Sequence, residues 1–145
     1  MWFLILIVKN YMTVRAFVDT NVLVYSQSNN GEKSQKAALL LQQYPVISTQ
    51  VINEAVSVLT RKYSVSRENA YLLAELWMDA CEVESLTIHT IRQAIRLSQQ
   101  HLLSHWDALI VAAALLAGCN LLYSEDMQHG YVFDGVLQVV NPFLS

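Results

Sequence analysis

The chain is poor in the residues that stiffen, cross-link or charge a protein. Its 145 residues include two cysteines, two prolines and four glycines, and only 14% are charged. Cys81 and Cys119 lie far apart in a chain without a secretory signature, so we expect reduced thiols and no disulfide framework. No repeat, low-complexity segment or Pro/Gly/Ser-rich linker divides the chain. This composition predicts one compact domain.

Long apolar runs are missing as well. The opening segment MWFLILIV has eight residues before Lys9 and Asn10, whereas a spanning helix needs about 20. It also lacks the basic start and the small-residue cleavage site of a signal peptide. We expect residues 1–11 to be an apolar leader upstream of a true start at Met12, the alternative being an extra edge strand. Residues 12–145 then form the domain, which we expect to be cytoplasmic and not bound to a membrane.

Positive charge is scarce, with nine Lys and Arg against twelve Asp and Glu and a net charge of -3. This balance excludes a global attraction to nucleic acid, so any such binding must be local. Arg61, Lys62 and Arg67 form one local basic cluster, but taken alone it is most simply a solvated helix surface. Apolar residues make up 54%, against about 45 to 50% in typical domains. This excess favours a partner that covers part of the surface.

Short β-rich runs alternate with longer helical runs, which predicts a parallel sheet with crossover helices. Strands are expected at residues 14–18, 46–48, 83–86, 120–123 and 137–140, and helices at 20–27, 32–43, 49–63, 66–80, from Thr87, and from Ser104 to Gly118. Thr49, Ser66 and Ser104 are the expected N-caps, and Gly118 suits the left-handed position after a helix. The predicted fold class is a single doubly wound α/β domain.

Four acids stand at the ends of apolar stretches, where burial penalises an unpaired carboxylate: Asp19, Glu54, Asp107 and Asp126. Each has a purely structural alternative. Asp19 can be an N-cap, Asp107 a favourable charge in the first turn of a helix, and Asp126 an ordinary loop acid. Glu54, considered by itself, is best explained as a solvated helix charge. The strand ends that carry two of these acids adjoin in a parallel sheet, so all four can reach one crevice.

Four neighbouring carboxylates raise one another's pKa unless a cation lies among them. Mg²⁺ or Mn²⁺ prefers oxygen ligands, and no Cys/His set here has the spacing of a zinc site. Such an ion suits hydrolysis of a phosphodiester, because it lowers the pKa of a bound water and neutralises the leaving oxygen. Thr20, Asn21 and Ser124 supply hydroxyl and amide groups that can orient the acids.

The segments DTNVLVY, INEAV, WDALIVAAAL and LLYSED resemble, in that order, the four acidic motifs of PIN-domain ribonucleases, most closely the VapC-type toxins of toxin–antitoxin pairs. The resemblance runs from about Val14 to about Val140. It implies a parallel sheet of about five strands in the order 3-2-1-4-5, and RNA cleavage with Mg²⁺ or Mn²⁺. It also implies a homodimer and a cognate antitoxin. Asp19, Glu54, Asp107 and Asp126 match the four acids, and Thr20, Asn21 and Ser124 match the accompanying polar positions.

Two rival functions also fit the sequence. A PIN-like domain that binds RNA or protein without cleaving would show no metal binding. An Mg²⁺-dependent phosphatase would use Asp19 as nucleophile, but that chemistry also needs a later lysine, and none follows Lys62. Glu125 adds an acid beside the fourth motif, with its direction undecided. Tyr63, Tyr71, Trp77 and Met78 are expected in the core or on a dimer face and not as a base-stacking platform.

Overall fold

The computed structural model describes residues 14–144. The predicted leader at residues 1–11 lies outside the described residues, and the placement of the domain boundary stays a prediction. Among residues 14–144, no helix combines the length and the apolar character needed to cross a membrane.

A mostly parallel sheet forms the centre of the molecule, with six strands in the order β3-β2-β1-β4-β6-β5. The strands are β1 Ala16–Val18, β2 Val46–Ser48, β3 Glu82–Glu84, β4 Leu121–Tyr123, β5 Val132–Phe133 and β6 Leu137–Val140. Five of them pair in parallel, as predicted, in the predicted order 3-2-1-4-5 if β6 counts as the fifth. The sixth, β5, runs antiparallel to β6 and was missed.

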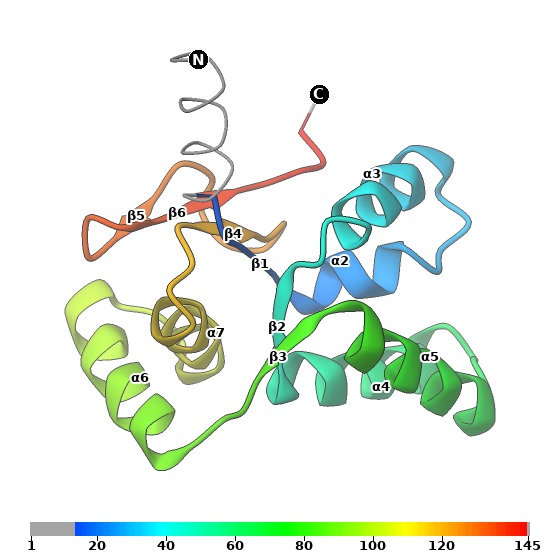
Figure 1. Cartoon of the computed structure of the whole chain (residues 1–145), viewed down its shortest axis with the longest axis horizontal. Helices are drawn as coiled ribbons and strands as arrows, with labels where there is room; N and C mark the ends of the chain where they lie inside the picture. Colours follow the sequence, from blue (N-terminus) through cyan, green and yellow to red (C-terminus); the bar gives the residue numbers. More distant parts are fainter. Residues whose placement is uncertain (1–13, 145) are drawn as a thin grey trace, which may run out of the picture.

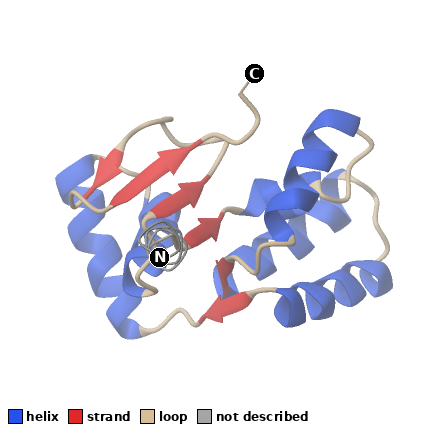
Figure 2. Ribbon diagram, turned by 45° about the horizontal axis from the view of Figure 1, so that its top comes forward, coloured by secondary structure: helices blue, strands red, loops and turns tan. Residues whose placement is uncertain are grey.

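Helices cover both faces of the sheet (Figures 1 and 2): α2 to α5 lie on one side and α6 and α7 on the other. They are α2 Thr20–Tyr25, α3 Gly31–Leu41, α4 Thr49–Lys62, α5 Arg67–Ala80, α6 Ile88–His101 and α7 His105–Leu116. The α/β class predicted from the alternating pattern is therefore confirmed.

Hydroxyl caps fix the starts of four helices, including α6, where Thr87 accepts from the Thr90 backbone N–H. The Ser66 and Ser104 hydroxyls accept hydrogen bonds from the backbone N–H groups of Asn69 and Asp107, as predicted. The predicted cap at Thr49 is wrong by one residue, because Ser48 accepts from Val51 and caps α4. The Thr49 hydroxyl instead accepts from the Leu86 backbone N–H. At the other end of α7, Gly118 has a φ of 75°, the left-handed conformation expected of it.

The core surrounds the central strands β1 and β4. Phe17 and Leu122 are fully buried and pair across these strands. In α7 every residue from 108 to 114 is buried, so this helix is enclosed all round, as its apolar sequence predicted. Because the enclosed part begins one residue after Asp107, packing of α7 fixes where that carboxylate lies.

Candidate active site

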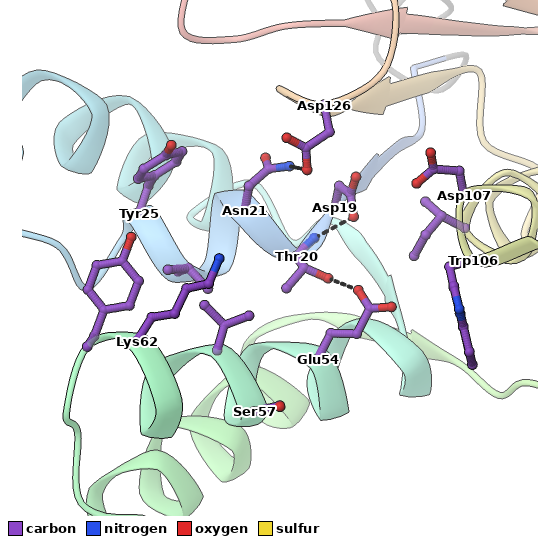
Figure 3. Close-up of a pocket in the computed structure, with 14 residues that line it drawn as sticks. Asp19, Thr20, Asn21, Tyr25, Glu54, Ser57, Lys62, Trp106, Asp107 and Asp126 are labelled. Carbon is purple, nitrogen blue, oxygen red and sulfur yellow. Dashed lines mark hydrogen bonds between the residues drawn. The ribbon is translucent and has the colours of Figure 1, made fainter. Parts of the chain in front are cut away.

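A pocket of about 400 Å³ opens where the parallel strands end, and all four predicted acids line it (Figure 3). Asp19 directly follows β1, and Asp126 lies in the connection after β4. Glu54 projects from α4 and Asp107 from the first turn of α7. Two strand ends and two helices thus bring together acids that are up to 107 residues apart in sequence, with Asp19 and Asp126 at the extremes.

Asp19 is the most buried of the four, with 6% of its surface exposed. Its Oδ1 accepts from the backbone N–H of Thr20 at 2.7 Å, and its Oδ2 accepts from the Ser124 hydroxyl at 2.8 Å. Burial raises the pKa of Asp19 to about 6 despite these two bonds, and the nearby carboxylates of Asp126 and Glu54 add to the rise. The carboxylate is therefore held rigidly in a place where its own charge is unfavourable.

Glu54 is held by two neighbours. The Thr20 hydroxyl donates to its Oε2 at 2.7 Å, and the Gln50 amide donates to its Oε1 at 2.7 Å. The same Gln50 amide donates to the backbone oxygen of Trp106 at 3.2 Å and so ties α4 to the start of α7. Glu54 is thus oriented into the pocket and is not the freely solvated helix charge that its sequence position alone favoured.

Asp107 lies in the first turn of α7, where Ser104 caps the helix through the Asp107 backbone N–H at 3.1 Å. Burial raises the pKa of its carboxyl group, and Asp126 and Glu54 add to the rise. Asp126 is exposed, and its Oδ2 accepts from the Asn21 side-chain amide at 3.2 Å. The Ser124 hydroxyl accepts from the Asp126 backbone N–H at 3.2 Å, so Ser124 positions both Asp19 and Asp126.

The donor set fits a hard divalent cation. Four carboxylates line one pocket, and no ion pair to Lys or Arg engages any of them among residues 14–144. The groups that donate hydrogen bonds to these carboxylates are hydroxyls and amides, which leaves the negative charge of the acids uncompensated. Within the same residues, however, no three acidic, histidine or cysteine side chains converge as tightly as an ion's ligand shell. The four acids therefore share one pocket without forming a closed ligand shell.

Some residues of the site were not expected from the sequence. Lys62 and Tyr63 line the pocket at the end of α4, whereas the sequence predicts Lys62 on the solvated surface and Tyr63 in the core or on a dimer face. In Figure 3 Lys62 and Tyr25 lie at one end of the pocket and Asp107 and Trp106 at the other. The four-residue spacing of Glu54, Val58 and Lys62, which places them on one helix face, was the signal for Lys62.

Other candidates lie outside the pocket. Glu125 accepts hydrogen bonds from the Tyr25 hydroxyl at 2.6 Å and from Lys33 at 2.7 Å, so it links α2 to α3. His101 ends α6 and His105 begins α7, and no zinc set forms among the described residues. Cys81 and Cys119 are buried free thiols, as predicted. Trp77 is buried, as expected of a core residue, whereas Tyr71 and Met78 are exposed.

The fold and the pocket together define a doubly wound α/β protein with an acidic pocket at the carboxyl edge of its sheet. The family model of the PIN domain matches residues 16–132. The chain therefore belongs to the PIN-domain family, as the four acidic segments predicted.

Several solved structures share this fold. VapC20 of Mycobacterium tuberculosis, described as a Sarcin-Ricin loop cleaving toxin, is 22% identical with a TM-score of 0.63, over 77% of this chain and 89% of that one. A toxin–antitoxin complex from Klebsiella pneumoniae is 24% identical with a TM-score of 0.65, over 88% of this chain and 98% of that one. VapBC2 from Rickettsia felis, bound to a DNA fragment from its promoter, is 16% identical with a TM-score of 0.62, over 87% of this chain and 98% of that one. No curated protein sequence matches the chain.

Proposed function

We propose that this protein is a metal-dependent endoribonuclease that hydrolyses RNA phosphodiester bonds as the toxin of a toxin–antitoxin pair. The observation that carries the proposal is the single pocket lined by Asp19, Glu54, Asp107 and Asp126, none of them paired with a basic side chain in the described part of the chain. Membership of the PIN-domain family and the toxins among proteins of the same fold support it.

Asp19 and Asp107 are the first-choice ligands for Mg²⁺ or Mn²⁺, and Glu54 and Asp126 complete the set directly or through water. When bound, such an ion supplies an activated water and neutralises charge on the scissile phosphate and the leaving oxygen. Ser124 and the Thr20 backbone N–H hold Asp19, and Gln50 and the Thr20 hydroxyl hold Glu54. Asn21 holds Asp126. No side chain of the protein is needed as nucleophile.

The proposed partners are an RNA substrate, a cognate antitoxin and a second copy of the chain in a homodimer, in the cytoplasm. An exposed apolar face on α5, formed by Tyr71, Leu72 and Leu76, is consistent with a protein partner. A toxin–antitoxin complex among the proteins of the same fold supports the proposal of an antitoxin partner.

The test is RNA cleavage by the purified protein, freed of antitoxin, with Mg²⁺ or Mn²⁺ and again with EDTA. We expect cleavage only with the metal ion, and none by Asp107→Asn. The matched control is Asp79→Asn, which changes an exposed acid on α5 away from the pocket and should cleave as the wild type does. Metal-independent cleavage, or equal cleavage by Asp107→Asn, contradicts the proposal.

Removing the Ser124 hydroxyl should impair the site without removing an acid. Ser124→Ala deletes the bond to Asp19 Oδ2 and the acceptor for the Asp126 backbone N–H. We expect RNA cleavage to fall by about 10- to 100-fold, the usual loss when a ligand's orienting partner is removed. Steady-state kinetics against Ser28→Ala measures this effect, because the Ser28 hydroxyl bonds only backbone groups, the Tyr25 oxygen and the Asn30 N–H, and no acid of the pocket. A loss shared equally by both variants would show that Ser124 has no special role.

Lys62 should bind the RNA backbone, because it is the one basic side chain among the described residues that line the pocket. In a non-cleaving Asp19→Asn background, Lys62→Ala should weaken binding of single-stranded RNA. The slope of log Kd against log salt should fall by about 0.7, the value for one phosphate contact on a single strand. Arg61→Ala, the exposed neighbour outside the pocket, is the control and should leave the slope closer to that of the parent. An unchanged slope for Lys62→Ala would show that Lys62 does not contact a phosphate of the RNA.

A further inference from the structure

A second pocket of about 270 Å³ adjoins the acidic pocket, and Asp107 and Asp126 line both. It lies between the α6–α7 corner and the chain that runs from β4 to β6, on the side of the sheet where Figure 1 shows α6 and α7. The two pockets therefore meet at the same two carboxylates. A phosphodiester held at Asp107 and Asp126 places one of its two nucleosides beside the second pocket.

The lining of the second pocket suits a neutral flat ring better than a phosphate. Its floor is apolar and buried, formed by Met127, Phe133 and Val139. No Lys or Arg is among the described residues that line it, and the two shared acids repel an anion. The Gln128 amide and the Tyr131 hydroxyl add polar groups to an otherwise apolar lining. Apolar faces with a polar edge are the properties of a nucleobase, and a site of this kind combines apolar walls with few polar groups.

Aromatic contacts hold this pocket in shape. The Tyr131 hydroxyl lies 2.8 Å from Nδ1 of His101. The His101 and Phe133 rings meet edge to face at 5.0 Å, and the Tyr131 and Phe133 rings lie 4.7 Å apart. His101 at the end of α6, Tyr131 just before β5 and Phe133 in β5 thus hold one another in place. A preformed pocket loses little side-chain freedom when a ligand enters it, which favours binding.

Leu102 at the pocket rim is in an unfavourable state in the free protein. It is the C-cap of α6 and is 92% exposed, and its φ of 56° is a left-handed conformation that residues other than glycine rarely adopt. An exposed leucine held in this conformation at the edge of a pocket offers apolar surface to whatever enters it.

We propose that this second pocket is a nucleobase subsite, which holds the base of one of the two nucleotides joined by the cleaved bond. Leu102 covers one side of the base, and Gln128 contacts its polar edge. The inference rests on the proposed ribonuclease function and adds to it the residues that select the base. Base preference next to the cut then depends on Leu102 and Gln128, whereas the chemistry depends on the four acids.

The experiment compares two substrates of one enzyme. Wild type and the double variant Leu102→Ala/Gln128→Ala are first incubated with single-stranded RNA randomised around the cut, and the products are sequenced. The rate constant kcat/KM is then measured on the preferred RNA and on bis(p-nitrophenyl) phosphate, which has no base. Alanine at position 102 keeps the Cβ, so the change alters the contact surface and leaves the backbone conformation as it was. The matched control is Leu39→Ala/Gln35→Ala, which truncates the same residue types on the exposed surface of α3.

We expect the pocket variant to lose about 10-fold in kcat/KM on the preferred RNA, within the range for one lost base contact. It should also lose base preference at one position beside the cut, and keep its rate on bis(p-nitrophenyl) phosphate. The control variant should match the wild type in all three. Unchanged base preference overturns the subsite. So does an equal loss on both substrates, which would mean that the acids themselves were disturbed.

The two proposals fail in different ways. If the wild type cleaves RNA, Asp19→Asn does not, and the pocket variant keeps its base preference, only the subsite is wrong. If the wild type cleaves no RNA, both proposals are wrong. If the pocket variant cleaves RNA normally but is inhibited less by an antitoxin, the pocket binds a protein segment, which also overturns the subsite.

Discussion

Asp19→Asn should lose at least about 100-fold in RNA cleavage, because removal of a direct ligand is expected to exceed the loss seen for an orienting partner. The same substitution should leave the metal-free protein as stable as the wild type at pH 8, or more stable. Asn is nearly isosteric with Asp and avoids a buried charge beside Asp126 and Glu54, whose proximity helps to raise the pKa of Asp19. Most substitutions of a buried residue destabilise, so this pairing of results is specific to a functional acid.

The two results are measured together, by steady-state kinetics on RNA with Mg²⁺ and by urea unfolding in EDTA. Asp79→Asn on α5 is again the matched control, with no change expected in either measurement. Retained cleavage by Asp19→Asn would refute its role in the reaction. A large loss of stability would instead make Asp19 a structural residue whose loss of activity reflects unfolding.

The stability of the metal-free protein should fall as pH rises between about 4 and 6. Burial raises the folded-state pKa of Asp19 to about 6 from an ordinary 3.8, so in this range the folded protein binds more protons than the unfolded chain. Stability is then fully present below the unfolded pKa and is lost as pH rises through the folded pKa, with a ceiling of about 3 kcal/mol for this one group. The raised pKa of Asp107 acts in the same direction.

Other acids act in the opposite direction and must be separated from Asp19. Arg96 lowers the pKa of Asp134, and Arg15 lowers that of Glu82. The contribution of each of these two acids to the stability of the fold is therefore lost as pH falls. The informative quantity is therefore the difference in unfolding free energy between wild type and Asp19→Asn, measured in EDTA at pH 4.5, 6 and 8. We expect the unfolding free energy of the wild type to fall relative to that of the variant as pH rises. Adding Mg²⁺ at pH 8 should reverse this fall. A difference that is independent of pH would show that Asp19 is not perturbed by burial.

The positions of the acids in the fold could be predicted because they follow from local patterns. Asp19 and Asp126 come directly after apolar runs that had to be strands, and parallel strands end at one edge of a sheet. Asp107 lies in the first turn of a helix that has no polar side chain after it, so the helix had to be enclosed and its first turn had to lie at the boundary of the core. These inferences needed no knowledge of side-chain contacts.

Some features were not predicted, either because they depend on contacts between distant segments or because their local signal is short or ambiguous. Gln50 joins Glu54 to the Trp106 backbone, and a single glutamine in a helix carries no sign of such a partner. Strand β5 has only two residues, too few for a recognisable alternation. The Asp134–Gly135 pair after it, with φ values of 52° and 67°, was the available signal of a tight hairpin and was missed. The cap of α4 was misplaced because Ser48 and Thr49 suit that position almost equally in sequence.

Direct titration of Mn²⁺ into the metal-free protein, followed by calorimetry, tests the central claim that these carboxylates together hold a divalent cation. We predict saturable binding by the wild type and by Asp79→Asn. For Asp19→Asn and Asp107→Asn we predict affinity at least about 10-fold weaker. No binding by the wild type, or equal binding by all four proteins, would contradict the account.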